Sequence, residues 1–195
     1  ITDPENNTTA YTYDAYGNIS TVEDPQTHLL TRYEYNTIGW KVAEVSPKTF
    51  RTEYDYDNNG RLLRSTLHGG ETTRIVYNAL GQVKQEVSPN LYSAELDDQT
   101  NNIYSGDHGT RYTYYPTGEV QTVTDAVYNT TTYSYNIYGN IENEIKPNGA
   151  IYEYDYDAMN RVIKKWFRES EEDNAVLLEE YQYTILSDKK TQTTQ

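Results

Sequence analysis

The residues 54–62 read Tyr-Asp-Tyr-Asp-Asn-Asn-Gly-Arg-Leu, in which two tyrosines are followed by an Asp-x-x-Gly turn signal and then by an aliphatic residue. Side chains two positions apart lie on the same face of a β-strand, so both tyrosine rings share one face. Aspartate hydrogen-bonds to the backbone of its own turn, and glycine adopts a positive φ without steric cost. The stretch therefore predicts a β-hairpin whose strands are joined by a type I turn with a glycine bulge.

The same pattern recurs along the whole chain with a period of 21 or 22 residues. Taking the second tyrosine of each pair as an anchor, the successive spacings are 22, 21, 21, 37, 21, 21 and 27 residues. A fixed period of this length is typical of a repeat architecture. The anchors are Tyr13, Tyr35, Tyr56, Tyr77, Tyr114, Tyr135 and Tyr156, with a partial copy at Tyr183.

We predict a single array over residues 1–195, with seven hairpin repeats over 11–168. The longer spacings predict insertions at 90–110 and 169–180, and a partial eighth repeat near 181–186. Residues 175–183 are compatible with either a short helix or a strand.

Each column of the repeat meets a requirement of the backbone. A second tyrosine stands two positions before the anchor in most copies, at Tyr11, Tyr33, Tyr54, Tyr112, Tyr133 and Tyr154. Turn-forming side chains stand one position after it, at Asp14, Asn36, Asp57, Asn78, Asn136 and Asp157. Glycines stand four positions after it, at Gly17, Gly39, Gly60, Gly81, Gly118 and Gly139, with Asn160 in the seventh copy. The columns predict structural roles for these residues.

The turn also predicts the register of each hairpin. If Asp14 pairs with Asn18, then Tyr13 faces Ile19, and aliphatic residues occupy the equivalent position in most copies. Lys41 interrupts this column, which leaves the register of the second repeat open. Because proline lacks the amide that a ladder needs, the second strand is expected to end at the proline column, Pro25, Pro47, Pro89 and Pro147.

Composition supports an all-β protein with little deep core. Only 35% of the residues are hydrophobic, and 22 of the 195 residues are tyrosine, whose ring packs on a half-buried surface while its hydroxyl stays hydrated. The formal net charge of −14 disfavours nucleic acid as a partner. No apolar run approaches the roughly 20 residues of a membrane helix, so membrane insertion is not expected.

The search for catalytic, cofactor and metal sites predicts none. In carboxylate pairs such as Asp55 with Asp57, the second aspartate stands in the turn column, which favours turn capping over catalysis. The three histidines, at positions 28, 68 and 108, lack zinc-site spacing. The insertion at 90–110 is rich in carboxylate and amide oxygens but has no EF-hand spacing, so we predict a plain polar loop, with calcium as the alternative. Gly106 lies outside the glycine column and is expected to tolerate substitution better than Gly60.

The motifs at 11–19, Tyr-Thr-Tyr-Asp-Ala-Tyr-Gly-Asn-Ile, and at 54–62 closely resemble the YD-repeat, or Rhs-repeat, family. The resemblance implies tandem antiparallel hairpins forming a curved or spiral single sheet, an open segment of the shells found in bacterial Rhs toxins, toxin-complex C-components and teneurins. The self-cleaving motif and the effector of those toxins have no counterpart in this sequence.

The expected function is that of a non-catalytic structural segment of a longer bacterial protein, secreted or on the cell surface, whose shell encapsulates or presents a toxin effector. Its expected partners are the rest of the parent shell and an enclosed effector domain. The alternative is a carbohydrate-binding or adhesive module, in which exposed tyrosines and Trp40 or Trp166 stack on sugar rings.

Overall fold

The computed structural model describes residues 1–183 and 189–194. The chain divides into two compact units, Ile1–Gly109 and Thr110–Gln195, and each is described by itself below.

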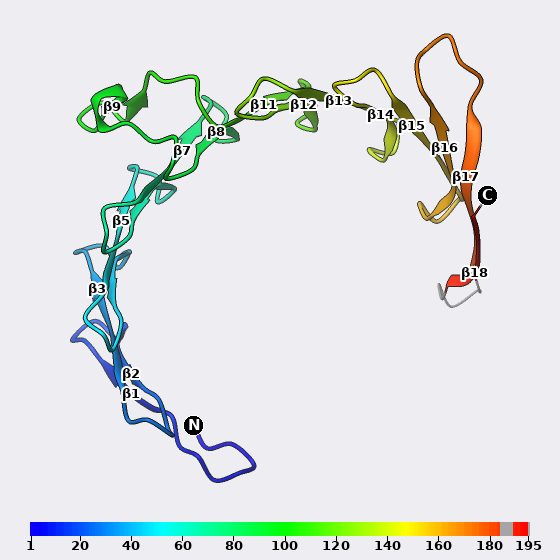
Figure 1. Cartoon of the computed structure of the whole chain (residues 1–195). Coiled ribbons are helices and arrows are strands. Elements are labelled where there is room, and N and C mark those ends of the chain that lie inside the picture. The colour runs from blue at the N-terminus through cyan, green and yellow to red at the C-terminus, as the bar shows by residue number, and fades with distance from the viewer. Residues whose placement is uncertain (184–188, 195) are drawn as a thin grey trace. The chain divides into compact units, whose positions relative to one another are not determined.

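Unit 1 is a strip of hairpins in which strands follow one another in chain order (Figure 1). Its strands are β1 (Ala10–Tyr13), β2 (Ile19–Glu23), β3 (Leu30–Tyr35), β4 (Lys41–Val45), β5 (Arg51–Tyr56), β6 (Leu62–Thr66), β7 (Thr72–Tyr77) and β8 (Val83–Val87). Every pairing between consecutive strands is antiparallel. The insertion after β8 contains a 3-10 turn, η1 (Ala94–Leu96), and a small hairpin of β9 (Asp97–Asp98) and β10 (Ile103–Tyr104).

Unit 2 repeats this plan. Its strands are β11 (Thr110–Tyr114), β12 (Val120–Thr124), β13 (Thr130–Tyr135), β14 (Ile141–Ile145), β15 (Ile151–Tyr156), β16 (Val162–Arg168), β17 (Val176–Tyr183) and β18 (Lys189–Thr194), again paired antiparallel in chain order. Within the 169–180 insertion expected from the sequence, residues 169–175 join two strands and Val176 begins β17. Residues 176–183 form a strand rather than a helix, and residues 184–188 of the partial eighth repeat lie outside the described residues.

The predicted register is present, and each hairpin adds a bulge to it. Tyr13 faces Ile19, and Tyr35 faces Lys41, so the second repeat keeps the common register despite its lysine. On the side of each anchor that faces away from the turn, the pairing shifts by one residue. Tyr56 pairs with Leu62, but Asp55 pairs with Arg64, which leaves Leu63 as the extra residue. The extra residue on the second strand is a β-bulge, which bends the strand and increases its twist.

Most turns at both ends of the hairpins have the same hydrogen-bonding pattern. After β5, the Gly60 amide donates to the Asp57 carbonyl (3.0 Å) and the Asp57 amide to the Arg61 carbonyl (2.9 Å). After β4, Thr49 donates to Ser46 and Ser46 to Phe50 in the same pattern, with Pro47 at the second turn position. Gly60 and Thr49 both have a positive φ, +81° and +64°.

Few side chains of the described residues are deeply buried. The buried apolar residues are Ala43, Leu63, Val87, Tyr104, Ala150 and Ile151, and the buried polar ones are Arg64, Thr72, Arg74, Gln85 and Asp97. A single-layer sheet leaves both faces near solvent, which explains the small core. Most of these residues lie where the insertion covers β6, β7 and β8.

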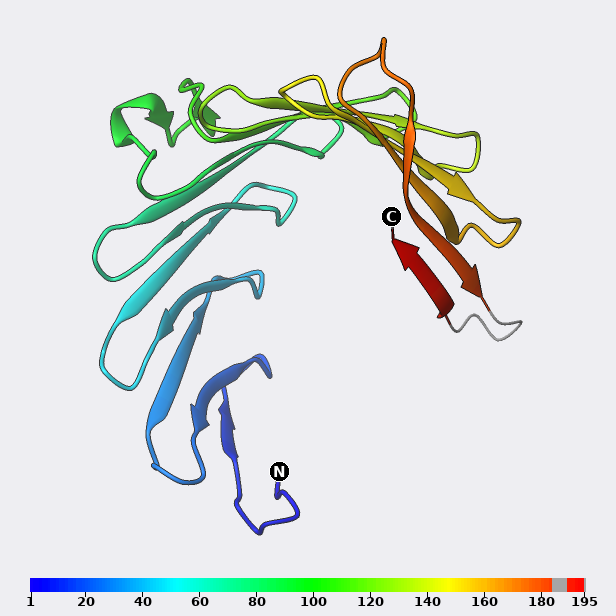
Figure 2. The same cartoon turned by 45° about the vertical axis from the view of Figure 1, so that its right-hand side comes forward.

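The predicted fold class is confirmed: tandem antiparallel hairpins form an open, twisted sheet, as the β1–β8 strip shows in Figure 2. Among the residues that the structure describes, no helix is long and apolar enough to cross a membrane.

Candidate functional site: the tyrosine face and the anchored insertion

The anchor tyrosines and their i−2 partners share one face of the sheet, here called the tyrosine face. In β5, Tyr54 lies opposite Ser65 and Tyr56 opposite Leu62. The intervening Asp55 lies opposite Arg64 on the other face, here called the reverse face. Most rings of the tyrosine face are half-buried, whereas Tyr13 on the first strand is 61% exposed.

Anchor hydroxyls hydrogen-bond to the bulge of the preceding repeat. The Tyr56 hydroxyl donates to the Lys41 carbonyl (2.9 Å), and Tyr77 donates in the same way to Leu62 (3.0 Å). Pairing between β4 and β5 begins only at Ala43 with Glu53, so the Lys41 carbonyl lies beyond the ladder. The same bond joins later repeats, from Tyr156 to Ile141 and from Tyr183 to Val162, both at 2.7 Å. The tyrosine thus supplies a hydrogen bond to a carbonyl that lies beyond the end of the backbone ladder.

Lys41, which interrupts the aliphatic column, is held among aromatic rings. Its ammonium lies 5.4 Å from the centre of the Tyr33 ring and 4.7 Å from that of Tyr54, and it contacts Glu44 Oε2 at 2.8 Å. Burial disfavours its charge, but the hydrogen bond to Glu44 and the neighbouring Tyr54 outweigh burial and raise the pKa of Lys41. In unit 2, Lys165 lies in a similar position over Tyr152 and Tyr154.

Burial and one acidic neighbour make Tyr154, on this face, a weaker acid than an ordinary tyrosine. Burial, followed by the charge of Glu144, raises the pKa of Tyr154 to about 12. The Tyr154 hydroxyl lies 3.3 Å from Glu144 Oε2. The neutral phenol is therefore favoured in the folded protein.

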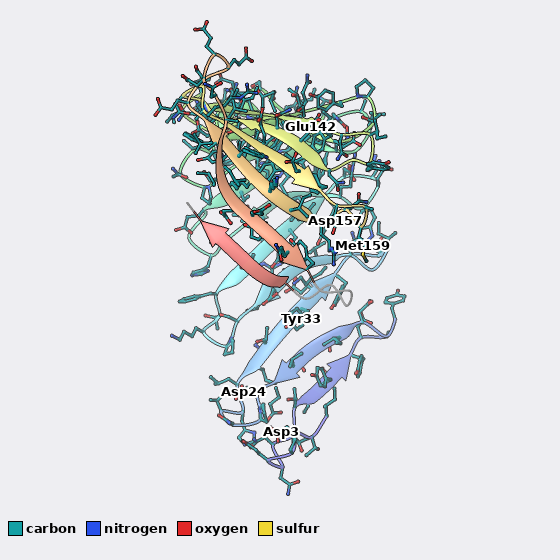
Figure 3. The ribbon with its side chains drawn as sticks, turned by 90° about the vertical axis from the view of Figure 1, so that its right-hand side faces the viewer. Asp3, Asp24, Tyr33, Glu142, Asp157 and Met159 are labelled. Carbon is teal, nitrogen blue, oxygen red and sulfur yellow. The ribbon has the colours of Figure 1, made fainter. Side chains whose placement is uncertain are left out.

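The aspartates of the repeat hold their turns. Asp57 Oδ1 accepts from the amides of Asn59 and Arg61, each at 2.9 Å, and Oδ2 accepts from Arg61 Nε at 2.6 Å. Burial alone would raise the pKa of Asp57, but the hydrogen bonds from Arg61 and Asn59 lower it. Asp157 makes the same contacts with Met159 and Arg161. Figure 3 labels Asp157 and Met159 in this turn. No reacting group is needed to explain these carboxylates.

The insertion is anchored to the reverse face by one buried carboxylate. Asp97 Oδ1 accepts from Arg74 Nε (3.1 Å) and Oδ2 from Arg64 Nη1 (3.0 Å), and the side chains of Asp97 and Arg74 are fully buried. The Tyr92 hydroxyl also donates to Oδ2 at 2.9 Å. Arg74 reaches back to the insertion through the Asn102 carbonyl (3.0 Å). These bonds use both oxygens of Asp97, so it is a structural anchor.

Other parts of the insertion are also packed rather than loose. Asp98 accepts from the amides of Thr100 and Asn101. Gln85 Nε2 on β8 donates to the carbonyls of Gly106 (2.9 Å) and His108 (2.6 Å). Gly106 is crowded, as Gly60 is: a Cβ at Gly106 would lie 2.6 Å from the ring of Tyr104 and 3.0 Å from Leu96, so its greater tolerance stays a prediction that rests on its backbone conformation.

Potential ligand groups are dispersed among the described residues, in which no three His, Cys, Asp or Glu side chains are grouped as metal ligands. Trp40 packs against Tyr56, with ring centres 5.6 Å apart, instead of standing free. Trp166 lines an open hollow of about 580 Å³ on unit 2. The charged residues that line the same hollow are Glu142, Glu153, Asp155 and Arg168. The Trp166 indole donates a hydrogen bond to Asp155 Oδ2 at 2.8 Å. Sequence reasoning did not foresee this hollow, because its residues come together through strand pairing.

Comparison with known proteins agrees with this construction. The RHS Repeat family model matches residues 1–29 and 56–90. Among solved structures, the crystal structure of TcdB2-TccC3 superimposes with a TM-score of 0.59 at 18% identity, covering 91% of this chain and 11% of that chain. The structure of TcdB2-TccC3 without its hypervariable C-terminal region gives 0.60 at 16% identity, covering 95% and 11%.

The chain thus spans about a tenth of the length of these solved chains, and at such identity the likeness concerns the fold alone. No curated protein matches the sequence significantly. The hairpin repeats, the family model matched over these two stretches and the shared fold together show that this chain contains hairpin repeats of the Rhs, or YD, type.

Proposed function

We propose that the chain is a non-catalytic wall segment of a larger bacterial Rhs protein, secreted or exposed on the cell surface, whose shell encloses or presents an effector. The observation that carries the proposal is the interlocking of successive hairpins by tyrosine hydroxyls. Four anchors bond to the bulge of the repeat before them, as Tyr56 does to Lys41 and Tyr77 to Leu62. Such nearest-neighbour bonds let a strip extend without a deep core.

The acidic and polar groups of the repeats are used by turns and ion pairs, which supports a structural role. A single-layer wall also needs polar contacts that survive beside solvent on both faces. The half-buried tyrosines meet this need, because their rings cover the sheet while their hydroxyls bond to backbone. The fold shared with TcdB2-TccC3 adds support by likeness.

Electron microscopy of the full-length parent protein tests the proposal. We expect a hollow particle, and we expect any domain that follows the repeats to resist protease. A Gly60→Val parent, whose wall is destabilised at a turn, should lose that protection. An extended particle, or a following domain cut equally fast in both proteins, would refute the shell function.

A second candidate is carbohydrate binding at the Trp166 hollow. An indole beside carboxylate and guanidinium groups suits the stacking and hydrogen bonding of a sugar ring. A glycan screen with the chain and its Trp166→Ala variant tests this function. Binding that depends on Trp166 would support it, while binding unchanged in the variant, or no binding, would eliminate this site.

A further inference from the structure

The residue five positions after each anchor, directly after the turn glycine, extends toward the following repeat. The residues of this column are Asn18, Trp40, Arg61, Gln82, Glu119, Asn140 and Arg161. Where the column holds arginine, its guanidinium covers the anchor ring of the next repeat. The guanidinium carbon of Arg61 lies 4.6 Å from the centre of the Tyr77 ring, and that of Arg161 lies 4.4 Å from the centre of the Tyr183 ring.

In these two copies the guanidinium is held by a carboxylate as well as by a ring. Arg61 Nε donates to Asp57 Oδ2 at 2.6 Å, and Asp57 is the first residue of the preceding turn. Arg161 Nε donates to Asp157 Oδ2 at 2.8 Å in the same way. A guanidinium suits this place because its planar face stacks on an aromatic ring while its nitrogens bond to a carboxylate.

The fifth copy keeps a carboxylate and a ring but has no guanidinium. Glu119 stands at the arginine position, and Tyr115 stands at the position of the turn aspartate. Glu119 extends over the next turn, since its Oε1 lies 3.9 Å from the place that a Cβ at Gly139 would occupy. Arg61 has the same placement over Gly81. The fifth copy therefore has an anion where the third and seventh have a cation.

An open hollow of about 380 Å³ lies at this point of unit 2, lined by residues of the turns that follow β11 and β13 (Figure 1). The rings of Tyr115 and Tyr135 form two of its walls, with centres 6.1 Å apart and planes at 90°. Glu119 and Ser134 also line it. The hollow thus combines aromatic walls with a carboxylate.

The Glu119 carboxylate is charged and incompletely paired. Hydrogen bonding by the Thr117 side chain and by the Glu119 amide holds the pKa of this carboxyl below its ordinary value, so it is ionised at neutral pH. Among the described residues, none donates a hydrogen bond to Glu119 Oε2, although this atom is buried. A buried oxygen without a donor is costly, so a donor that a ligand brings would stabilise the site.

We propose that this hollow binds the guanidinium group of an arginine, which stacks on Tyr135 and donates hydrogen bonds to Glu119. The ligand restores the arrangement of carboxylate, guanidinium and ring that Arg61 and Arg161 form within the chain. A lysine ammonium fits less well, because it is a compact, strongly hydrated charge that cannot stack or bond through two nitrogens. The inference is independent of the shell function, since it concerns contacts of a single repeat.

NMR titration of the chain tests the proposal, with the amide signals of Asn136 and Gly139 as reporters of the hollow. The probes are a capped Gly-Arg-Gly peptide, the same peptide with lysine or glutamine in place of arginine, and free arginine. The Glu119→Gln variant removes the charge, and Glu119→Arg places a guanidinium of the chain itself in the hollow. Matched controls are Glu172→Gln and Glu172→Arg, because Glu172 is an exposed glutamate of the same unit that does not line the hollow.

We expect the arginine peptide to shift both signals saturably and to bind more tightly than the lysine peptide, while the glutamine peptide leaves the signals unchanged. Glu119→Gln should weaken binding about tenfold or more, because a hydrogen bond to a charged group contributes on that order. Glu119→Arg should abolish binding, and both Glu172 variants should bind as the unchanged chain does. Amide signals far from the hollow show whether each variant is folded.

The order of affinities for the peptide and for free arginine identifies the source of the guanidinium. Tighter binding of the peptide indicates an arginine within a polypeptide, and tighter binding of free arginine indicates the amino acid. Unshifted signals with both, equal affinities for the arginine and lysine peptides, or equal losses in the Glu119 and Glu172 variants would overturn the proposal. Each of these outcomes does so whether or not microscopy of the parent shows a hollow shell.

Discussion

Replacing Asp97 by Asn tests whether a single carboxylate fixes the insertion to the sheet. The change keeps the size of the side chain but leaves Arg64 and Arg74 buried beside a neutral amide. Arg64 retains Asp55 at 3.0 Å, whereas Arg74 retains only the carbonyls of Leu63, Ile75 and Asn102. Removing one partner of a buried ion pair costs about 3–5 kcal/mol. A whole domain has about 5–15 kcal/mol of stability, so unit 1 should lose a large part of its own.

Urea unfolding followed by tryptophan fluorescence measures this loss for unit 1 alone. The chain has two tryptophans, Trp40 in unit 1 and Trp166 in unit 2. In a Trp166→Phe background the signal therefore reports unit 1. The matched control is Asp98→Asn, because Asp98 is the exposed neighbour of Asp97 and bonds only within its own turn.

A double-mutant cycle with Arg74→Met sharpens the result. Since Arg74 is the guanidinium left unpaired, the combined cost of Asp97→Asn and Arg74→Met should fall well below the sum of the single costs. Equal midpoints for Asp97→Asn and Asp98→Asn, or strictly additive costs in the cycle, would refute the anchoring role of Asp97.

Four further outcomes are expected. Gly60→Ala should lower the melting temperature more than Gly17→Ala. Both residues have a positive φ, which costs an alanine about 1–2 kcal/mol, but only the Cβ at Gly60 would meet a neighbour, Trp40 at 2.9 Å. Equal melting temperatures for the two variants would contradict this reasoning. Tyr56→Phe should cost about 0.5–1.5 kcal/mol through the lost hydrogen bond, while Tyr16→Phe at an exposed tip should be silent, and an equal effect of both would remove the hydroxyl argument. The pKa of Tyr154 is raised above its unfolded value, so its contribution to stability is present below pH 10 and is lost as the pH rises toward about 12. The melting temperature of Tyr154→Phe should therefore fall less between pH 10 and pH 12 than that of the unchanged chain. Chelator should leave the unfolding midpoint unchanged, and a fall that calcium restores would show a metal site in the insertion.

The local structure of each repeat could be predicted from the sequence because its causes lie within a few residues. The Asp57 and Gly60 columns specify the turn, the turn specifies that Tyr56 faces Leu62, and the alternation of Tyr54 with Tyr56 specifies the face. Even Lys41 follows the common register, because hydrogen bonding in the turn, and not the paired side chain, sets it.

Tertiary structure alone decided what depends on contacts between repeats. The tyrosine hydroxyl that bonds to the preceding repeat follows from how one hairpin pairs with the next. Asp97 reads as a loop oxygen in the sequence, yet it meets Arg64 and Arg74, which lie 33 and 23 residues away. The crowding of Gly106 has the same cause, since its neighbours Tyr104 and Leu96 approach it only when the insertion folds. Local hydrogen bonding is encoded in short motifs, whereas burial and ion pairing arise only when distant segments are brought together.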